Sequence, residues 1–293
     1  MSVRSFHHAE FPPDRLREER EATISVCVPA REEAATIASV VAPLVALREA
    51  GVVDQVVVVD DESRDGTGAI AASLGAEVHR PTQLLAQYGP VLGKGDAMWR
   101  ALSVCSGELV CFVDADSQNF DAHFACGLLG PLVCEPGVHF VKGFYRRPFD
   151  NGGGDVQPTG GGRVSELTAR PLLRAFFPEL ATVRQPLAGE IAAPRELLER
   201  IAFCTGYGVD MGLLLDVHAE AGPDALAQVD LDVRQNRHQS LEDLPPMAAA
   251  VLGAVTSRLR RDGRLAGEAA DGGELAPVER PPQTELRALR RAG

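Results

Sequence analysis

The sequence has no apolar run that approaches the roughly 20 residues needed for a membrane-spanning helix. Its first 22 residues are rich in charge and have no apolar stretch, so we expect no secretory signal there. Basic residues number 29 against 41 acidic ones, for a formal net charge of −12. Nucleic-acid-binding surfaces need to be basic. We therefore expect a cytoplasmic protein that binds neither a membrane nor a nucleic acid.

Lysine is nearly absent, because only Lys94 and Lys142 among the 29 basic residues are lysine. Lysine at these two positions is a weak indication that a compact ammonium group matters there. There is also no Cys-x-x-Cys pair, and the cysteines lie mostly in apolar runs. This pattern predicts buried, reduced thiols rather than disulfides or a zinc site. The cysteines are Cys27, Cys105, Cys111, Cys126, Cys134 and Cys204.

Short β-branched runs alternate with amphipathic stretches from residue 24 to residue 144. The pattern predicts strands at 24–28, 56–60, 77–79, 109–113 and 139–144, with helices at 36–48, 66–74, 96–103 and 123–133. Apolar strands alternating with helices are typical of an α/β fold, in which helices cover both faces of a mostly parallel sheet. Such sheets bind ligands at the carboxyl ends of their strands.

The pattern changes on both sides of this region. We expect residues 1–22 to form a polar, loosely docked extension and residues 262–293 to form a disordered tail. Between glycine-rich residues 151–162 and the tail, the sequence predicts helices at 164–176, 195–200, 210–221 and 247–261 and a strand at 227–233.

The strongest motif is Asp114-Ala115-Asp116, which ends the apolar strand at 109–113. In an extended segment, residues two apart point to the same side, so both carboxylates would converge beyond the sheet. Close like charges need a cation or ligand hydroxyl groups to compensate them. A Mg²⁺ or Mn²⁺ ion bound to a nucleotide diphosphate fits this need.

Three further motifs indicate an anionic ligand, each with a plainer alternative. Lys94 lies between two glycines, as in a phosphate-binding loop, although the spacing of a Walker A loop is absent. Asp60, at the end of a predicted strand, suits a ribose or base contact, while the turn after it could serve only as a helix cap. Arg163 and Ser165 follow three glycines and suit a phosphate or carboxylate, or the glycines form only a hinge.

The motifs occur together in the order ISVCVPAREEAATI, VVVDDESRDGT, LGKGDAMW, CFVDADS, VKGFYRRPF, TGGGRVSELTARPLL, RQPLAGE and TGYGVDMGLLLD. On these segments the chain resembles the glucosyl-3-phosphoglycerate synthases and the related mannosyl-3-phosphoglycerate synthases over about residues 24–244. These are actinobacterial glycosyltransferases with a GT-A-type fold.

The resemblance implies a retaining, Mg²⁺- or Mn²⁺-dependent transfer of a hexosyl group, with UDP-glucose as the favoured donor and 3-phosphoglycerate as the acceptor. It also implies a homodimer, a nucleotide-sugar-binding half at residues 23–144 and an acceptor-binding half at residues 145–261. One alternative keeps this chemistry with a different small anionic acceptor in a specialised-metabolite pathway. A nucleotidyltransferase is less favoured, because the chain lacks the glycine-rich, basic first loop of those enzymes.

The resemblance assigns roles to individual positions. It places Pro29, Ala30, Glu33, Asp60, Lys94, Asp114 and Ala115 at the nucleotide, Leu187 and Asp210 at the reacting sugar, Gly162, Arg163, Ser165 and Asn236 at the acceptor, and Asp116 and His238 at the metal. The family usually reads Val-Arg-x-His-Arg-Asn where this chain reads Val-Arg-Gln-Asn-Arg-His. Whether Asn236 or His238 faces the metal is therefore left open by the sequence.

Overall fold

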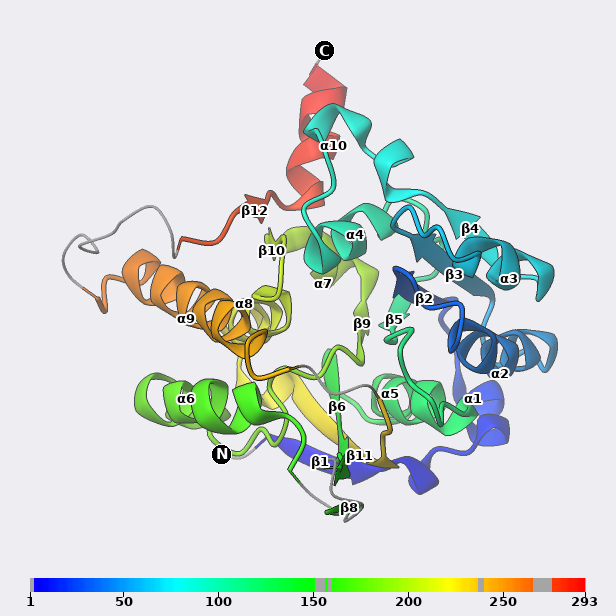
Figure 1. The fold of residues 1–293 in the computed structure, drawn as a ribbon, viewed down its shortest axis with the longest axis horizontal. Helices are drawn as coiled ribbons and strands as arrows, with labels where there is room; N and C mark the ends of the chain where they lie inside the picture. Colours follow the sequence, from blue (N-terminus) through cyan, green and yellow to red (C-terminus); the bar gives the residue numbers. More distant parts are fainter. Residues whose placement is uncertain (1–2, 151–155, 158–159, 237–239, 266–275, 293) are drawn as a thin grey trace.

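The structure, a computed structural model, describes residues 3–150, 156–157, 160–236, 240–265 and 276–292. Its centre is an eight-stranded sheet made of β1 (Arg4–His7), β2 (Ile24–Ala30), β3 (Gln55–Asp60), β4 (Glu77–His79), β5 (Leu109–Phe112), β6 (Phe140–Arg146), β9 (Ile191–Pro194) and β11 (Leu226–Val233). The strand order is β1-β11-β6-β9-β5-β2-β3-β4 (Figure 1). Only β9 runs antiparallel to its neighbours in this sheet, so the sheet is mostly parallel, as predicted.

The helices pack on both faces of the sheet (Figure 1). They are α1 (Pro13–Glu19), α2 (Ile37–Glu49), α3 (Thr67–Ser73), α4 (Lys94–Ala101), α5 (Ala122–Cys134), α6 (Arg170–Phe176), α7 (Arg195–Arg200), α8 (Val209–Ala221), α9 (Leu244–Arg261) and α10 (Gln283–Ala292). A π-helical turn, Ser165–Ala169, precedes α6. Two small sheets pair β10 (Phe203–Cys204) with β12 (Glu279–Arg280) and β7 (Phe149–Asp150) with β8 (Val156–Gln157). Among the described residues, no helix combines the length and apolar character that crossing a bilayer requires.

The strands divide the core into two apolar layers, because successive side chains of a strand point to opposite faces. Val26 and Val28 of β2 pack in the layer covered by α1, α2 and α5, whereas Cys27 packs in the layer covered by α4, α8 and α9. β3 repeats the alternation, with Val56 and Val58 on the first face. A strand that is apolar on both faces fits only inside a covered sheet, which confirms the predicted fold class.

Two predictions about the ends of the chain are wrong. Arg4–His7 do not fray but form β1, which pairs in parallel with β11, and the nearby Phe11 and Leu16 are fully buried. Residues 279–292 of the predicted disordered tail form β12 and α10, and Arg280 is buried there against Asp96. Both segments have few apolar residues, so periodicity did not detect them. They are held by long-range contacts instead.

The direction of the strands brings distant residues to one edge of the sheet. β2, β3, β5, β6 and β11 are parallel, so their carboxyl ends lie at the same edge. β9 runs the other way, and its beginning therefore lies at that edge too. The sequence did not predict β9. Its position brings residues 187–190, just before it, next to the ends of the parallel strands.

Candidate active site

A cavity of about 540 Å³ opens at this edge of the sheet. Most of the residues that the sequence assigned to a nucleotide, a sugar or a metal line it. These are Pro29, Ala30, Glu33, Lys94, Asp114, Ala115, Asp116, Leu187, Asp210 and Asn236. Residues that the sequence did not single out complete the wall, among them Arg31, Asp61, Arg147, Arg234 and Met247.

Lys94 pairs with two carboxylates in the cavity, those of Asp114 and Asp210. It begins α4, and its Nζ lies 2.6 Å from Asp114 Oδ1 and 3.8 Å from Asp210 Oδ2. Burial disfavours the charged amine, but the two carboxylates outweigh this and raise the pKa of Lys94 well above its usual value. Burial likewise opposes ionisation of Asp114, yet Lys94 and Arg234 hold its pKa far below the usual range. Both groups are therefore charged at neutral pH.

Two glycines near this pair are required by close packing. A Cβ on Gly189 would overlap both Lys94 Nζ and the Asp114 carboxylate. A Cβ on Gly95, directly after the lysine, would overlap the Cys204 carbonyl oxygen. Gly95 is thus required by packing against β10 rather than by a phosphate, a role that the sequence motif alone did not distinguish.

Arg234 is buried and connects three carboxylates of the site, those of Asp114, Asp116 and Glu190. Its side chain is 1% exposed, and its guanidinium lies 3.0 Å from Asp114 Oδ2, 2.8 Å from Glu190 Oε1 and also in contact with Asp116 Oδ1. Its Nε donates to Ser117 Oγ at 2.8 Å. A planar guanidinium has five donors in a fixed arrangement, whereas an ammonium group has three, so an arginine can bridge more acceptors at one position.

Glu190 and Tyr145 support the arginine. Tyr145 donates its hydroxyl proton to Glu190 Oε2 at 2.8 Å and accepts hydrogen bonds of 2.8 Å from both Arg147 and Arg234. Burial raises the pKa of the Tyr145 hydroxyl to about 12. Burial also raises the pKa of Glu190, although Arg234 opposes the shift. Tyr145, Glu190 and Arg234 are buried, and their hydrogen bonds fix the orientation of Arg234 at the cavity.

Asp114 and Asp116 both contact Arg234 but differ in their other partners. Both oxygens of Asp114 are engaged by Lys94 and Arg234. Asp116 is 35% exposed, and its Oδ2 accepts a hydrogen bond of 3.2 Å from Asn236 Nδ2. The structure therefore brings Asn236 to the aspartate that the sequence assigned to the metal. His238, the other candidate, lies outside the described residues.

Asp210, on the first turn of α8, has an oxygen available to a ligand. Its Oδ1 is buried and has no hydrogen-bond partner among the described residues. Burial raises the pKa of Asp210, although Lys94 and Lys142 lower it. A buried acceptor without a partner is costly, so a ligand hydroxyl that enters the cavity gains by donating to it.

Four predicted site residues do not line the cavity. Asp60 turns instead toward the loop before α3, where its Oδ1 accepts from the Ser63 N–H at 3.2 Å, and Asp61 takes its place at the wall. The others are Gly162, Arg163 and Ser165, of which Ser165 is buried. The turn that carries them is joined to the cavity wall at one point, where the Gly161 N–H donates to the carbonyl oxygen of Arg147, which does line the cavity, at 3.3 Å.

The sequence contained weak signals for some of the residues that were missed. Lys142 was noted only because lysine is rare. It is buried on β6, its Nζ donates to the Ala188 carbonyl at 2.8 Å, and burial lowers its pKa to about 8. Arg234 follows the predicted strand at 227–233, at the end where ligands bind. Nothing in the sequence pattern pointed to Glu190, because β9 itself was not predicted.

The chain is similar to characterised proteins over most of its length. A family model described as glycosyl transferase family 2 matches residues 25–185. The glucosyl-3-phosphoglycerate synthase of Mycolicibacterium paratuberculosis is 47% identical over 238 residues, which cover 80% of this chain and 72% of the relative. That of Petrotoga mobilis is 39% identical over 268 residues, which cover 89% of this chain and 82% of the relative.

Solved structures are similar over nearly the whole chain. The mannosyl-3-phosphoglycerate synthase of Rubrobacter xylanophilus matches with a TM-score of 0.89 at 44% identity, covering 97% of both chains. The glucosyl-3-phosphoglycerate synthase of Mycobacterium tuberculosis, in complex with Mn²⁺, UDP-glucose and phosphoglyceric acid, matches with a TM-score of 0.84 at 39% identity. That match covers 97% of this chain and 99% of the other. The predicted fold class is confirmed by both.

Proposed function

This chain belongs to the glucosyl-3-phosphoglycerate synthases within glycosyl transferase family 2, and we propose that it transfers a glucosyl group from UDP-glucose to 3-phosphoglycerate. The observation that carries the proposal is the cavity, where Lys94, Arg234 and two aspartates meet at the ligand-binding edge of the sheet. It occurs in a chain that matches, over 97% of its length, a structure holding UDP-glucose, Mn²⁺ and phosphoglyceric acid.

The donor set at Asp116 fits a hard divalent cation such as Mg²⁺ or Mn²⁺. The carboxylate is partly exposed, and the neighbouring Asn236 carries an amide oxygen as well as the amide nitrogen that bonds Asp116. Carboxylate, amide and phosphate oxygens are the ligands that such ions prefer. Asp116 and Asn236 would hold the ion, which would neutralise part of the diphosphate charge.

The side chains of the cavity suit the donor. Lys94 places a permanent positive charge where a leaving diphosphate gains negative charge, and its pairing with Asp114 holds the ammonium in position. Asp210 offers its partnerless Oδ1 to a hydroxyl group of the sugar. Arg234 contacts both aspartates without entering solvent, and together with Lys94 it lowers the pKa of Asp114. These residues bind and orient the donor, and none of them needs to form a covalent bond to it.

The acceptor would lie between the cavity and the turn at residues 160–165. Arg147, which lines the cavity, joins this turn through its carbonyl oxygen. Arg163 would bind the phosphate or carboxylate of the acceptor, with the backbone of Gly162 and the hydroxyl of Ser165. Holding the acceptor here would bring its hydroxyl group toward the sugar held near Leu187 and Asp210.

A direct assay tests the proposal. Purified protein is incubated with UDP-glucose, MgCl₂ and 3-phosphoglycerate, and release of UDP is measured against samples that lack the acceptor. We expect acceptor-dependent release, with UDP-glucose used faster than GDP-mannose. UDP release with another small acid but none with 3-phosphoglycerate would reject the proposed acceptor, and release of pyrophosphate would indicate a nucleotidyltransferase.

The product of the same incubation tests the finer proposal of retention. Retention of the anomeric configuration gives an α-linked product from the α-linked donor, which the coupling of the anomeric proton in ¹H NMR distinguishes from a β-linked product. A β-linked product would contradict retention without contradicting the proposed substrates.

Light scattering of the purified protein tests the proposed homodimer, whose mass should be twice the 31.2 kDa of the chain.

Replacing Arg163 with alanine tests the acceptor site. We expect the KM for 3-phosphoglycerate to rise about 10- to 100-fold while kcat and the KM for UDP-glucose change little, because a charge-assisted contact to the acceptor is lost. Arg174→Ala, at an exposed position on α6, is the control and should leave both constants unchanged. An unchanged KM for the acceptor in Arg163→Ala would remove Arg163 from the proposed site.

A further inference from the structure

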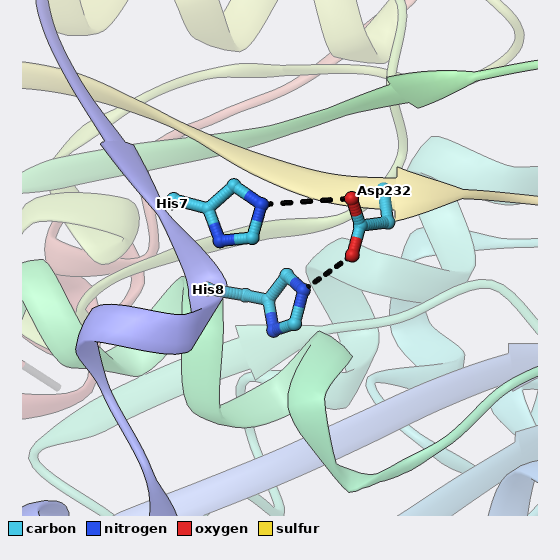
Figure 2. Close-up of side chains that lie close together, drawn as sticks. All are labelled: His7, His8 and Asp232. Atoms are coloured by element: carbon cyan, nitrogen blue, oxygen red, sulfur yellow. Dashed lines mark hydrogen bonds and ion pairs between the residues drawn. The ribbon is translucent and has the colours of Figure 1, made fainter.

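Two adjacent histidines and an aspartate form a cluster outside the active-site cavity. His7 ends β1, His8 begins the 3-10 turn after it, and Asp232 lies near the end of β11. Since β1 and β11 are parallel neighbours, their carboxyl ends meet at one edge of the sheet. Figure 2 shows both imidazole rings turned toward the Asp232 carboxylate. We call these three residues the histidine–aspartate cluster, and none of them lines the active-site cavity.

The distances suit a small cation. His8 Nε2 lies 2.7 Å from Asp232 Oδ2, and His7 Nε2 lies 3.5 Å from Asp232 Oδ1 (Figure 2). One ligand atom from each residue can be chosen so that all lie within 4.8 Å of one another. Tetrahedral ligands of Zn²⁺ at 2.0–2.1 Å lie about 3.4 Å apart. Each atom would therefore move by about 1 Å or less to hold the ion.

The backbone brings the carboxylate to the histidines. β11 has an irregular register between Asp230 and Val233, and Asp232 has a φ of 65°. Aspartate is one of the few residues that adopts this left-handed conformation readily. The Asp232 N–H donates to Asp230 Oδ1 at 3.0 Å, which stabilises the bulge. The bulge thus directs a carboxylate toward the end of the edge strand.

The surroundings of the cluster are acidic and hold the rings in place. His8 packs between His7 and His123, with ring centroids 4.5 Å and 4.4 Å away, and its side chain is 17% exposed. Asp121 lies 3.9 Å from His123, and no lysine or arginine pairs with Asp232 among the described residues. His7 and Asp232 are nearly half exposed, so a dissolved ion can reach them and water can complete its coordination.

Metal binding through Nε2 of His7 requires the ring of His7 to change its tautomer. Its Nδ1 now accepts a hydrogen bond of 3.2 Å from the Ala9 N–H, so a neutral ring carries its proton on Nε2. Metal binding at Nε2 moves that proton to Nδ1 and ends this exposed bond. The other bond of the turn, from the His7 N–H to Glu10 Oε1 at 2.6 Å, is unaffected.

We propose that the histidine–aspartate cluster binds a divalent transition-metal ion of the Zn²⁺ class. The two imidazoles and the carboxylate would supply three ligands and water the fourth, a set that such ions prefer over Mg²⁺. The bound ion cross-links the end of β1 to the end of β11, two residues before Arg234. The proposal rests on these residues alone and holds whatever the substrate of the active site.

Cobalt and zinc titrations test this site. The full chain, without any histidine tag and freed of metal, is titrated with Co²⁺ at about pH 7.5 in excess Mg²⁺, which occupies oxygen-only sites. We expect one equivalent of Co²⁺ to give the visible absorption bands of a tetrahedral ion, which Zn²⁺ removes by displacement. Zn²⁺ should also raise the melting temperature, because the assembled cluster binds it more tightly than the unfolded chain does.

Three variants show where the ion binds. His7→Gln/His8→Gln should lose more than about 100-fold in Co²⁺ affinity and the rise in melting temperature with Zn²⁺. His79→Gln, a histidine 4.0 Å from Glu77 on β4, is the matched control and should retain both. If the double variant does not fold, Asp232→Asn tests the same site from β11. Unchanged binding in the folded variants, or no binding by the original chain, would overturn the proposal. Glycosyl transfer without Zn²⁺ should be unaffected by the histidine substitutions.

Discussion

Asp116→Ala should lower kcat for glycosyl transfer by about a thousandfold or more while the protein remains folded. Asp116 is the partly exposed carboxylate of the cavity, and Asn236 is the neighbouring amide that would share the cation with it. Without this carboxylate the cation loses a protein ligand, and the diphosphate loses the cation that would neutralise part of its charge. The measurement is UDP release at saturating UDP-glucose and 3-phosphoglycerate, with Mn²⁺ varied.

Asp14→Ala is the control for this loss, because Asp14 lies on α1 with a side chain that is 78% exposed. It should turn over at the original rate. Asn236→His is the informative companion, since it restores the histidine that the family usually has at this position. We expect it to lower the Mn²⁺ concentration needed for half-maximal activity. Full activity of Asp116→Ala at low Mn²⁺ would contradict a metal role for this residue.

Arg234→Met should abolish activity and lower the free energy of unfolding by about 3–5 kcal/mol. The guanidinium is buried and contacts Asp114, Asp116 and Glu190. Its removal takes a buried counter-charge away from all three carboxylates and leaves Asp114 with Lys94 alone, which costs far more than breaking an exposed ion pair. Urea unfolding followed by circular dichroism measures the change. Arg17→Met, which breaks the exposed pair with Asp14, should cost less than about 1 kcal/mol.

The loss of stability in Arg234→Met should depend on pH in a defined direction. Burial already raises the pKa of Glu190 above its usual value, and Arg234 opposes that shift. Without the arginine the pKa in the folded state rises further, so the folded state holds a proton that the unfolded state releases. Stability is then lost as pH rises above the usual glutamate pKa. The free energy of unfolding of the variant should therefore be closer to that of the original protein near pH 5 than near pH 8. The opposite trend would contradict this account of Glu190.

Local patterns in the sequence were enough to predict most of the sheet and its ligand-binding edge. The apolar runs that became β2, β3 and β5 lie within two residues of their predicted bounds, because a strand buried on both faces needs continuous apolar residues. The aspartates after β5 and the lysine that begins α4 line the cavity as expected. These predictions required only the order of residues along short segments.

The sequence therefore predicts an α/β chain with acidic and basic groups at the ends of its parallel strands. The tertiary structure alone decided which charges meet there. Arg234 reaches Asp116 across 118 residues of sequence, and His8 reaches Asp232 across 224. It also decided that β9 runs antiparallel and brings Glu190 beneath the site. The physical reason is that periodicity depends on a few neighbouring residues, whereas a buried charge finds its partner only when the strands have taken their order in the sheet.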